Sequence, residues 1–470
     1  MKYRSLAAGA ALMGAAYAKD TQTFAVMRFN GDEIFEGRLD PIVNPGDLSP
    51  HVHTVFGGSN FGPNATGESL AQSSCTSAKV KGDNSAYWMP RIYFHDEAEG
   101  TFEPVPVLYT NVYYFFDATD DEIKPFPKGL NMLTGDTNRR TPPTDSGKQN
   151  LDPNAGPINN IFFTCARTSH DPPSWPPNSD GSKYGMASDE RDHQGVGFPL
   201  QKCDAMASPL RADAHFPSCY NPDAGLTSYK DNMAFPTAAG NGKLNCPEGY
   251  IHVPRLIFEV YWNTQQFDDR WTPDGKTQPF VLSNGDVTGY SLHADVLAAW
   301  DEDVLQTIID GCNVQHQDMD TCPGVESNTE TCTCEGEANN FRISTDSPLK
   351  KLPGNNPLSG FQYGDAPVPS DSDSSNSDSG NSDSNDSDSS DGSYAEETQA
   401  PGPETEAPVD RGYDEPAVTQ APLPTAEPVC STKTKTVVET VTVWEDAAPE
   451  ETAGTYAKRH LERHARRHRF

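Results

Sequence analysis

The run Leu256-Ile-Phe-Glu-Val-Tyr-Trp262 decides the fold class of this chain, because β-branched and aromatic residues dominate it and its length suits a strand. Similar runs occupy 24–29, 88–94 and 105–116, and clusters of Pro, Gly, Asn and Asp separate them. Short strands divided by such turn residues are typical of antiparallel folds. We therefore predict a mainly β domain with a β-sandwich or jelly-roll-like core and long loops.

One segment, 291–312, has the periodicity of a helix instead. Its apolar residues recur every four positions, at Leu292, Val296, Trp300, Val304 and Ile308. This spacing gathers them on one helix face, so we predict a helix at the C-terminal end of the β domain. If that helix begins at 291, His293 lies in its first turn.

Composition divides the chain into a folded part and flanking segments. Residues 1–18 combine basic residues, a short apolar stretch and small residues near the end, which is the pattern of a cleavable signal peptide. The globular β domain is expected over 19–335, and a disordered acidic linker rich in Ser, Asp, Pro and Thr over 336–428. A Thr/Val-rich segment at 429–456 and a basic His/Arg tail at 457–470 follow.

The signal peptide predicts a secreted protein. The Thr/Val-rich segment resembles segments near the ends of many fungal cell-wall proteins, so we expect the protein to be extracellular or associated with the cell wall. No later apolar stretch is long enough to span a bilayer, so no membrane span is expected. The net charge is −33, and the range 366–420 carries fourteen acids against Arg411 alone. Because an acidic surface repels phosphate backbones, nucleic acid is not an expected partner. Sequons at Asn64 and Asn385 fit a glycoprotein.

Ten cysteines in a chain with a secretion signal predict disulfide bonds rather than thiolate metal ligands. Nine of them precede residue 335, and Cys430 stands apart. One of the nine must therefore be free, or must pair with Cys430 or with another chain. Cys165 lies in the apolar run 158–165, where a thiol can be buried without reacting, so we expect Cys165 to be the free one.

Two segments far apart in the sequence carry the strongest candidates for a functional site. His51 and His53 are separated by one residue, and His293 and Asp295 repeat that spacing. In an extended chain, side chains at i and i+2 project from one face, roughly 6.5 to 7 Å apart. The two pairs could therefore converge on one ion or one ligand, although histidines at turns are as often ordinary polar side chains.

The first hypothesis is a metal-dependent extracellular enzyme or a metal-binding protein. In it, His51, His53 and His293 are the ligands of a divalent metal, and Asp295 is a fourth ligand or a partner of one. Three imidazoles leave coordination positions open on zinc, copper or iron, as catalysis requires. The sequence does not identify the metal.

The second hypothesis is a carbohydrate-active hydrolase or lyase, in which two carboxylates act as acid and base or nucleophile. The candidates lie in motifs rather than in a featureless acidic surface, and they are Asp40, Asp83, Asp286 and Asp295. Aspartates next to Gly and Asn usually stabilise turns, which is the more common role for Asp83 and Asp286. The histidines would then position or protonate the substrate.

The third hypothesis is a glycan-binding wall protein without catalysis, with cell-wall polysaccharide as its partner. Trp88 and Tyr290 are among the aromatic residues that could stack on sugar rings, although aromatic residues on apolar strands are more often part of the core. Arg91 could clamp an anionic sugar, and it could equally pair with a buried acid.

These candidates lie in blocks that follow one another along the chain, at 40–61, 84–94, 216–220 and 283–301. Together the blocks resemble the DUF1996 domain of secreted fungal proteins over about 24–323. The resemblance implies an extracellular domain and no particular reaction. One position departs from the family pattern, because Asn232 stands where that family often has histidine.

Overall fold

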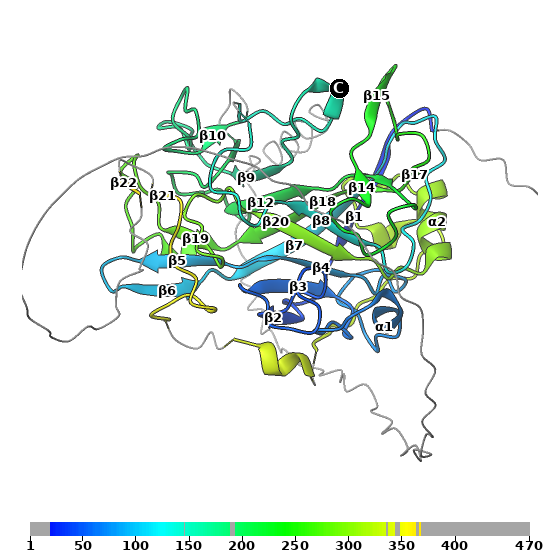
Figure 1. The fold of residues 1–470 in the computed structure, drawn as a ribbon, viewed down its shortest axis with the longest axis horizontal. Helices are drawn as coiled ribbons and strands as arrows, with labels where there is room; N and C mark the ends of the chain where they lie inside the picture. The colour runs from blue at the N-terminus through cyan, green and yellow to red at the C-terminus, as the bar shows by residue number, and fades with distance from the viewer. Residues whose placement is uncertain are drawn as a thin grey trace, which may run out of the picture. The chain divides into compact units, whose positions relative to one another are not determined.

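Two antiparallel sheets form the body of the domain (Figure 1). The computed structural model describes residues 19–144, 146–188, 193–334, 337–343, 348–362 and 366–367. The larger sheet has seven strands, in the order β1 (Thr23–Arg28), β7 (Val107–Phe116), β18 (Arg255–Trp262), β12 (Leu210–His215), β9 (Ile161–Cys165), β11 (Gln194–Val196) and β10 (Met186–Ala187). The second has five, in the order β2 (Phe35–Gly37), β3 (His53–Gly57), β4 (Ala86–Pro90), β20 (His293–Leu297) and β8 (Asn131–Gly135).

The two sheets pack face to face around one hydrophobic core. Phe258 of β18 contacts Phe56 of β3 and Tyr87 of β4, with ring centroids 6.5 and 6.1 Å apart. These side chains alternate with residues on the opposite faces of their strands, as strand geometry requires. The prediction of a mainly β fold with a sandwich core is confirmed.

Smaller elements surround the sandwich. Three short strands pair as β19 (Phe280–Leu282), β5 (Ile92–Asp96) and β6 (Thr101–Pro104), and three others as β14 (Met233–Ala234), β13 (Cys219–Tyr220) and β17 (Ile251–His252). Two hairpins consist of β15 (Thr237–Gly240) with β16 (Lys243–Asn245), and of β21 (Phe361–Gln362) with β22 (Ala366–Pro367). The helices are α1 (Gly67–Ala71) and α2 (Glu302–Gly311), with short 3-10 turns η1 (Pro153–Ala155), η2 (Thr264–Phe267), η3 (Met319–Thr321) and η4 (Glu337–Phe341).

The predicted helix over 291–312 is correct only in its second half. Residues His293–Leu297 form β20, which pairs with both β4 and β8. A spacing of four residues is also a multiple of two, so the apolar residues that suggested a helix face fit one face of a strand equally well. The helix α2 begins after Asp301, whose side chain accepts hydrogen bonds from the amides of Asp303 and Val304.

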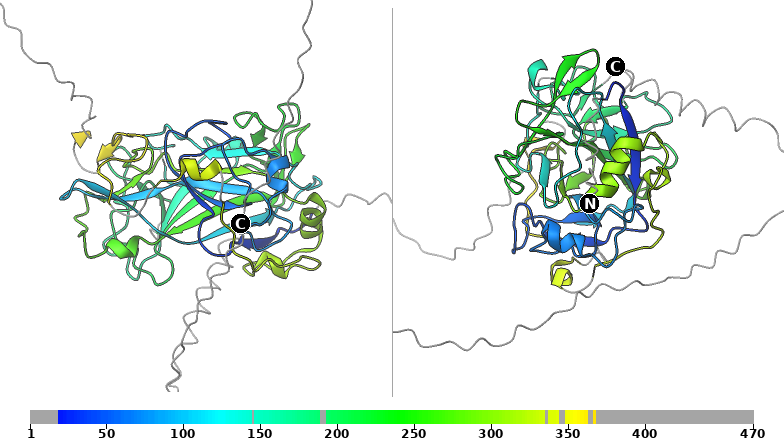
Figure 2. Two further views of the ribbon diagram at one scale, coloured as in Figure 1. Left: turned by 90° about the horizontal axis from the view of Figure 1, so that it is seen from below. Right: turned by 90° about the vertical axis from the view of Figure 1, so that its right-hand side faces the viewer.

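The right-hand view of Figure 2 shows α2 beside β1, at the side of the domain. Lys19, which precedes β1, donates a hydrogen bond to the carbonyl of Ile309 there. The buried face of α2 consists of Leu305, Ile308 and Ile309. No helix among the residues that the structure describes is long and apolar enough to cross a bilayer.

Four disulfides join described cysteines, in the pairs Cys75–Cys332, Cys165–Cys203, Cys219–Cys246 and Cys312–Cys322. The prediction that Cys165 is the free cysteine is therefore wrong. The chain returns past the end of β9 and brings the Cα atom of Cys203 within 4.9 Å of that of Cys165. Cys430 lies outside the described residues.

Packing continues beyond residue 335, the expected end of the domain. Ala338 and Leu352 are buried, and Leu349 pairs with Phe102 through backbone hydrogen bonds. The folded unit therefore includes described residues that composition had assigned to the linker. The signal peptide at 1–18, the remainder of the linker, the Thr/Val-rich segment and the basic tail lie outside the described residues.

Candidate functional site

His51, His53 and His293 come together on the outer face of the five-stranded sheet. His53 pairs with Pro90 of β4, while Asp295 pairs with Trp88 two residues earlier on the same strand. This register places His53 and His293 at one level, on either side of β4. Ring centroids are 4.4 Å apart for His51 and His53, 5.1 Å for His51 and His293, and 5.7 Å for His53 and His293.

Backbone carbonyls fix the tautomers of two of these rings. Nδ1 of His53 lies 2.9 Å from the carbonyl oxygen of Leu39, and Nδ1 of His293 lies 2.8 Å from that of Ser291. A carbonyl only accepts hydrogen bonds, so each Nδ1 carries the proton and each Nε2 carries a lone pair. Nε2 of His53 has no hydrogen-bond partner among the described residues.

Burial keeps the three imidazoles neutral. It lowers the pKa of His53 and that of His293 to about 4, and it lowers the pKa of His51 well below its usual value, helped by the two neighbouring histidines. Neutral imidazole is the form that binds metal ions. The cluster is thus ready to act as a ligand set at neutral pH.

The nitrogen positions fit a divalent metal ion. One ring nitrogen from each histidine lies within 4.8 Å of the other two, and the Nε2 atoms of His51 and His293 are 3.2 Å apart. Two nitrogens bound tetrahedrally at about 2.0 to 2.1 Å from an ion are about 3.4 Å apart. Without an ion, His51 must donate to His293, because the Nε2 atom of His293 has no proton to give.

Asp295 lies on the same face of β20 as His293 and is fully buried. Neither of its carboxylate oxygens has a hydrogen-bond partner among the described residues. Burial raises the pKa of Asp295 well above its usual value, and the nearby charge of Asp40 raises it further. An orphaned buried carboxyl beside three neutral histidines is what a cation nearby would stabilise. Its oxygens are not part of the group within 4.8 Å.

Asp40 is partly satisfied by its own loop. Its Oδ1 atom accepts hydrogen bonds from the amides of Ile42 and Val43. Burial raises the pKa of Asp40, while these hydrogen bonds and the neighbouring His293 oppose that rise. Asp40 therefore lies near the histidines as a second buried acid.

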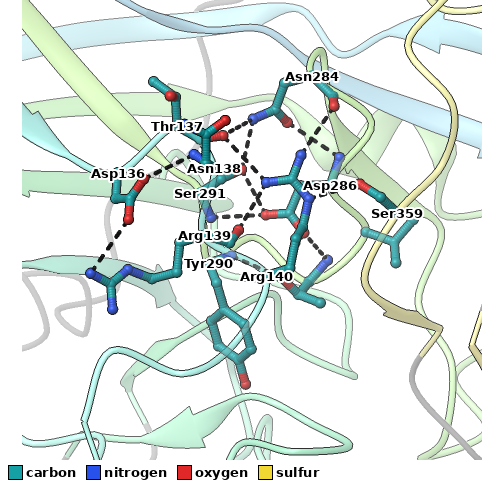
Figure 3. A network of polar contacts seen from close by, with 12 residues as sticks. Asp136, Thr137, Asn138, Arg139, Arg140, Asn284, Asp286, Tyr290, Ser291 and Ser359 are labelled. Carbon is teal, nitrogen blue, oxygen red and sulfur yellow. Dashed lines mark hydrogen bonds and ion pairs between the residues drawn. The ribbon is translucent and has the colours of Figure 1, made fainter. Parts of the chain in front are cut away.

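Asp286 holds the turn that leads into β20 (Figure 3). Its Oδ1 accepts from the amide and hydroxyl of Thr288, and its Oδ2 accepts from the amide and hydroxyl of Ser291. Arg140 donates to the carbonyl of Asn284 and the hydroxyl of Ser359 in the same network. Because both carboxylate oxygens are used, Asp286 positions the carbonyl of Ser291 and through it the ring of His293. The turn-forming role considered for Asp286 fits these contacts.

Asp83 has a similar structural setting, away from the histidines. Its Oδ1 accepts from the amide of Ser85, and its Oδ2 accepts from the hydroxyl of Tyr87. Burial raises the pKa of Asp83 to about 6. Asp83 therefore anchors the start of β4.

Two residues considered for substrate binding are buried in the domain. Arg91 pairs with Glu36 at 2.7 Å, which is the structural role considered for it. Trp88 is fully buried and packs against Phe61, so it presents no surface to a ligand. Tyr290 is different, because it is one of the residues that line a cavity, while its hydroxyl donates to the carbonyl of Gly181.

That cavity has a volume of about 160 Å³ and lies at the end of β8. Its lining includes Gly135, which pairs with His293 across the β8–β20 ladder. A Cβ atom at Gly135 would come within 2.8 Å of the Cα atom of His293, so only glycine allows this close approach. The cavity and the three histidines therefore belong to the same end of the sheet.

A family model described as a domain of unknown function, DUF1996, matches residues 40–300. The chain belongs to the DUF1996 family. The matched part of this DUF1996 domain includes His51, His53 and His293, the two aspartates near them, and the core strands of both sheets. No curated protein and no solved structure matches the chain.

Sequence reasoning missed a charged cluster on the outer face of the seven-stranded sheet. Arg211 pairs with both oxygens of Asp213 and with Glu259, which lies opposite Asp213 on β18. All three side chains are nearly buried. The sequence contains the pattern that could have revealed this cluster. Arg211 and Asp213 are two positions apart in an apolar strand, and residues at that spacing share a face. The guanidinium of Arg211 can neutralise only one of the two carboxylates, so Glu259 favours its protonated form.

This arrangement predicts a pH-dependent stability. Burial raises the pKa of Glu259 from its ordinary 4.5 to about 7, and Asp213 adds to the rise while Arg211 opposes it. Protonated Glu259 therefore stabilises the folded state. Its contribution to the free energy of unfolding is fully present below about pH 4.5 and is lost as pH rises through about 7, a change of roughly 3 kcal/mol. Urea unfolding of Glu259→Gln and wild type at several pH values should show their difference growing over that window. The exposed Glu248→Gln is the control, and equal pH profiles for all three proteins would contradict the assignment.

Proposed function

We propose that this DUF1996 domain is an extracellular metal-binding protein in which His51, His53 and His293 hold one divalent transition metal ion. The observation that carries the proposal is the geometry of the ring nitrogens. Two Nε2 atoms lie 3.2 Å apart, and backbone carbonyls direct the lone pairs of His53 and His293 toward the shared space. Four disulfides among the described residues are compatible with an oxidising, extracellular location.

A bound ion would supply Lewis-acid chemistry and a water of lowered pKa. Residues of the chain would hold the histidine ligands in position and would offset the positive charge of the ion. Asp286 holds Ser291, and the carbonyl of Ser291 holds the ring of His293 in one tautomer. Asp295 lies on the same face of β20 as His293, and Asp40 interacts electrostatically with His293, so either carboxylate would offset part of the added positive charge. Two carboxyls beside three histidines could also exchange protons with a substrate, as the second hypothesis requires.

A role in the cell wall or on extracellular carbohydrate is the second part of the proposal. The observation that favours it is the half-polar cavity that begins at Gly135, beside the histidines. Both catalytic action on carbohydrate and simple glycan binding use such a cavity.

We expect the purified full chain to contain about one equivalent of zinc or copper by elemental analysis. After chelation, titration with Co²⁺ should produce the visible absorption of a low-symmetry histidine site. His53→Ala and His293→Ala should each weaken metal affinity by more than about 100-fold, because even partners of ligands contribute 10- to 100-fold.

His95→Ala is the matched control, because His95 is half-buried and stacks on Phe102 outside the cluster. It should leave metal binding unchanged. A wild-type chain that takes up no stoichiometric metal, or equal affinities for His53→Ala and His95→Ala, would remove the basis of the proposal. Circular dichroism of each variant separates loss of ligand from loss of fold.

A further inference from the structure

We infer that the cavity at the end of β8 binds one neutral sugar unit, such as the terminal hexose of a glycan. The inference goes beyond the proposed metal site, because none of the three histidines lines this cavity, and it rests on the carbohydrate part of the proposed function, whose sugar class it names. It also concerns residues that the sequence did not suggest, with the exception of Tyr290. The lining of the cavity includes Asp136, Arg139, Asn159, Phe163, Val196 and Tyr290.

The size of the cavity suits a single ring. Its volume of about 160 Å³ is many times the space that a single water molecule needs, so the cavity has room for a ligand of the size of one sugar ring. Its floor is buried, whereas Asp136 at its rim is exposed. A cavity with a closed floor and an open rim accepts the terminal sugar of a glycan more readily than a sugar in the middle of the glycan.

One of the lining residues, Asn159, carries a hydrogen-bond acceptor without a partner among the described residues. Asn159 is 1% exposed, and its Oδ1 atom has no partner among the described residues. Its amide nitrogen donates to the carbonyl of Lys148 at 2.8 Å, which fixes the orientation of the amide group. A buried acceptor without a partner is costly, so a donor such as a sugar hydroxyl is the group that completes it.

The rest of the lining mixes apolar and polar residues. Phe163, Val196 and Tyr290 contribute to it, and so do Asn160 and glycines. Figure 3 shows the Tyr290 ring directed away from the Asp286 network, and its hydroxyl is engaged with the carbonyl of Gly181. The hydroxyl of Tyr290 is therefore not available to a ligand. A lining of both apolar and polar groups matches a sugar, whose C–H faces are apolar and whose edges carry hydroxyls.

The charges at the rim favour a neutral ligand. Arg139 and Asp136 form an ion pair at 3.8 Å, which is visible at the edge of Figure 3. The pair contributes no net charge, and each partner retains hydrogen-bonding capacity for a hydroxyl group. A uronic acid or a phosphate would gain from Arg139 but would be repelled by Asp136. We therefore assign the cavity to an uncharged sugar.

The test is direct binding to the full chain. Saturation-transfer NMR and calorimetry should use methyl glucoside, methyl mannoside, methyl galactoside, N-acetylglucosamine and glucuronate as probes. At least one uncharged sugar should bind saturably. Ile158→Trp, which places a large ring at the half-exposed rim, should weaken that binding by at least about tenfold because it fills the cavity.

Leu108→Trp is the matched control, because Leu108 is 43% exposed on β7 and does not line the cavity. It should bind sugar as the wild type does. Absence of binding by every uncharged probe, preference for glucuronate alone, or equal binding by Ile158→Trp and wild type would overturn the inference. Wild-type protein treated with a chelator should keep sugar binding, so failure of the metal proposal and failure of this inference remain distinguishable.

Discussion

Replacing both Cys75 and Cys332 with alanine should lower the free energy of unfolding by about 5 kcal/mol, the largest effect of any single disulfide here. The bridge joins residues 257 positions apart, and removing it frees a very long loop in the unfolded chain. Other bridges inside the loop shorten it, so about 5 kcal/mol is an upper value. Both cysteines pack with the cluster that covers the outer face of the five-stranded sheet. Urea unfolding of the full chain measures the loss.

The matched control is the pair Cys312→Ala and Cys322→Ala, whose bridge spans only 10 residues. The loop model gives it about half the effect, roughly 3 kcal/mol. Equal losses for the two double variants would show that native packing around each bridge, and not the length of the loop, determines its contribution.

Arg211→Met should destabilise the domain by about 3 to 5 kcal/mol at pH 8, because it leaves two buried carboxylates on adjacent strands without a cation. The Nη2 atom of Arg211 lies 3.0 Å from Asp213, and its Nη1 atom lies 3.2 Å from Glu259. The loss should shrink at pH 5, where Glu259 is protonated. Thermal and urea unfolding at both pH values measure it.

The decisive comparison adds Asp213→Asn and Glu259→Gln to Arg211→Met. Removing all three charges should recover most of the lost stability, because the cost arises from unpaired charge and not from lost packing. A triple variant as unstable as Arg211→Met would instead indicate that the stem of Arg211 and its contact with Tyr261 matter most.

The strands of the sandwich could be predicted from the sequence, but their partners could not. The runs at 24–29, 105–116 and 256–262 correspond closely to β1, β7 and β18. Composition identifies a strand because β-branched and aromatic side chains suit a pleated surface. It does not reveal that β7 lies between β1 and β18, since pairing depends on contacts between distant segments.

The matching i, i+2 patterns were enough to propose that His51 and His53 approach His293. They were not enough to predict the distances between the rings. We expected the rings of His51 and His53 to lie 6.5 to 7 Å apart along a strand, whereas their centroids are 4.4 Å apart. His51 lies in a bend before β3 begins, and the bend turns its ring toward its neighbour. The orphaned state of Asp295 and the pairing of Arg91 with Glu36 depend on burial, which sequence spacing does not supply.

The histidine cluster joins two parts of the chain that are 242 residues apart, and this determines when it can exist. A chain synthesised only as far as β18 contains His51 and His53 but not His293, and β20 must still insert between β4 and β8. Pairing of such distant strands is slow compared with local structure formation. In a nascent or partly folded chain, His51 and His53 are therefore not yet joined by His293. If the proposed site binds a metal ion, that ion would load only after β20 has paired with β4 and β8.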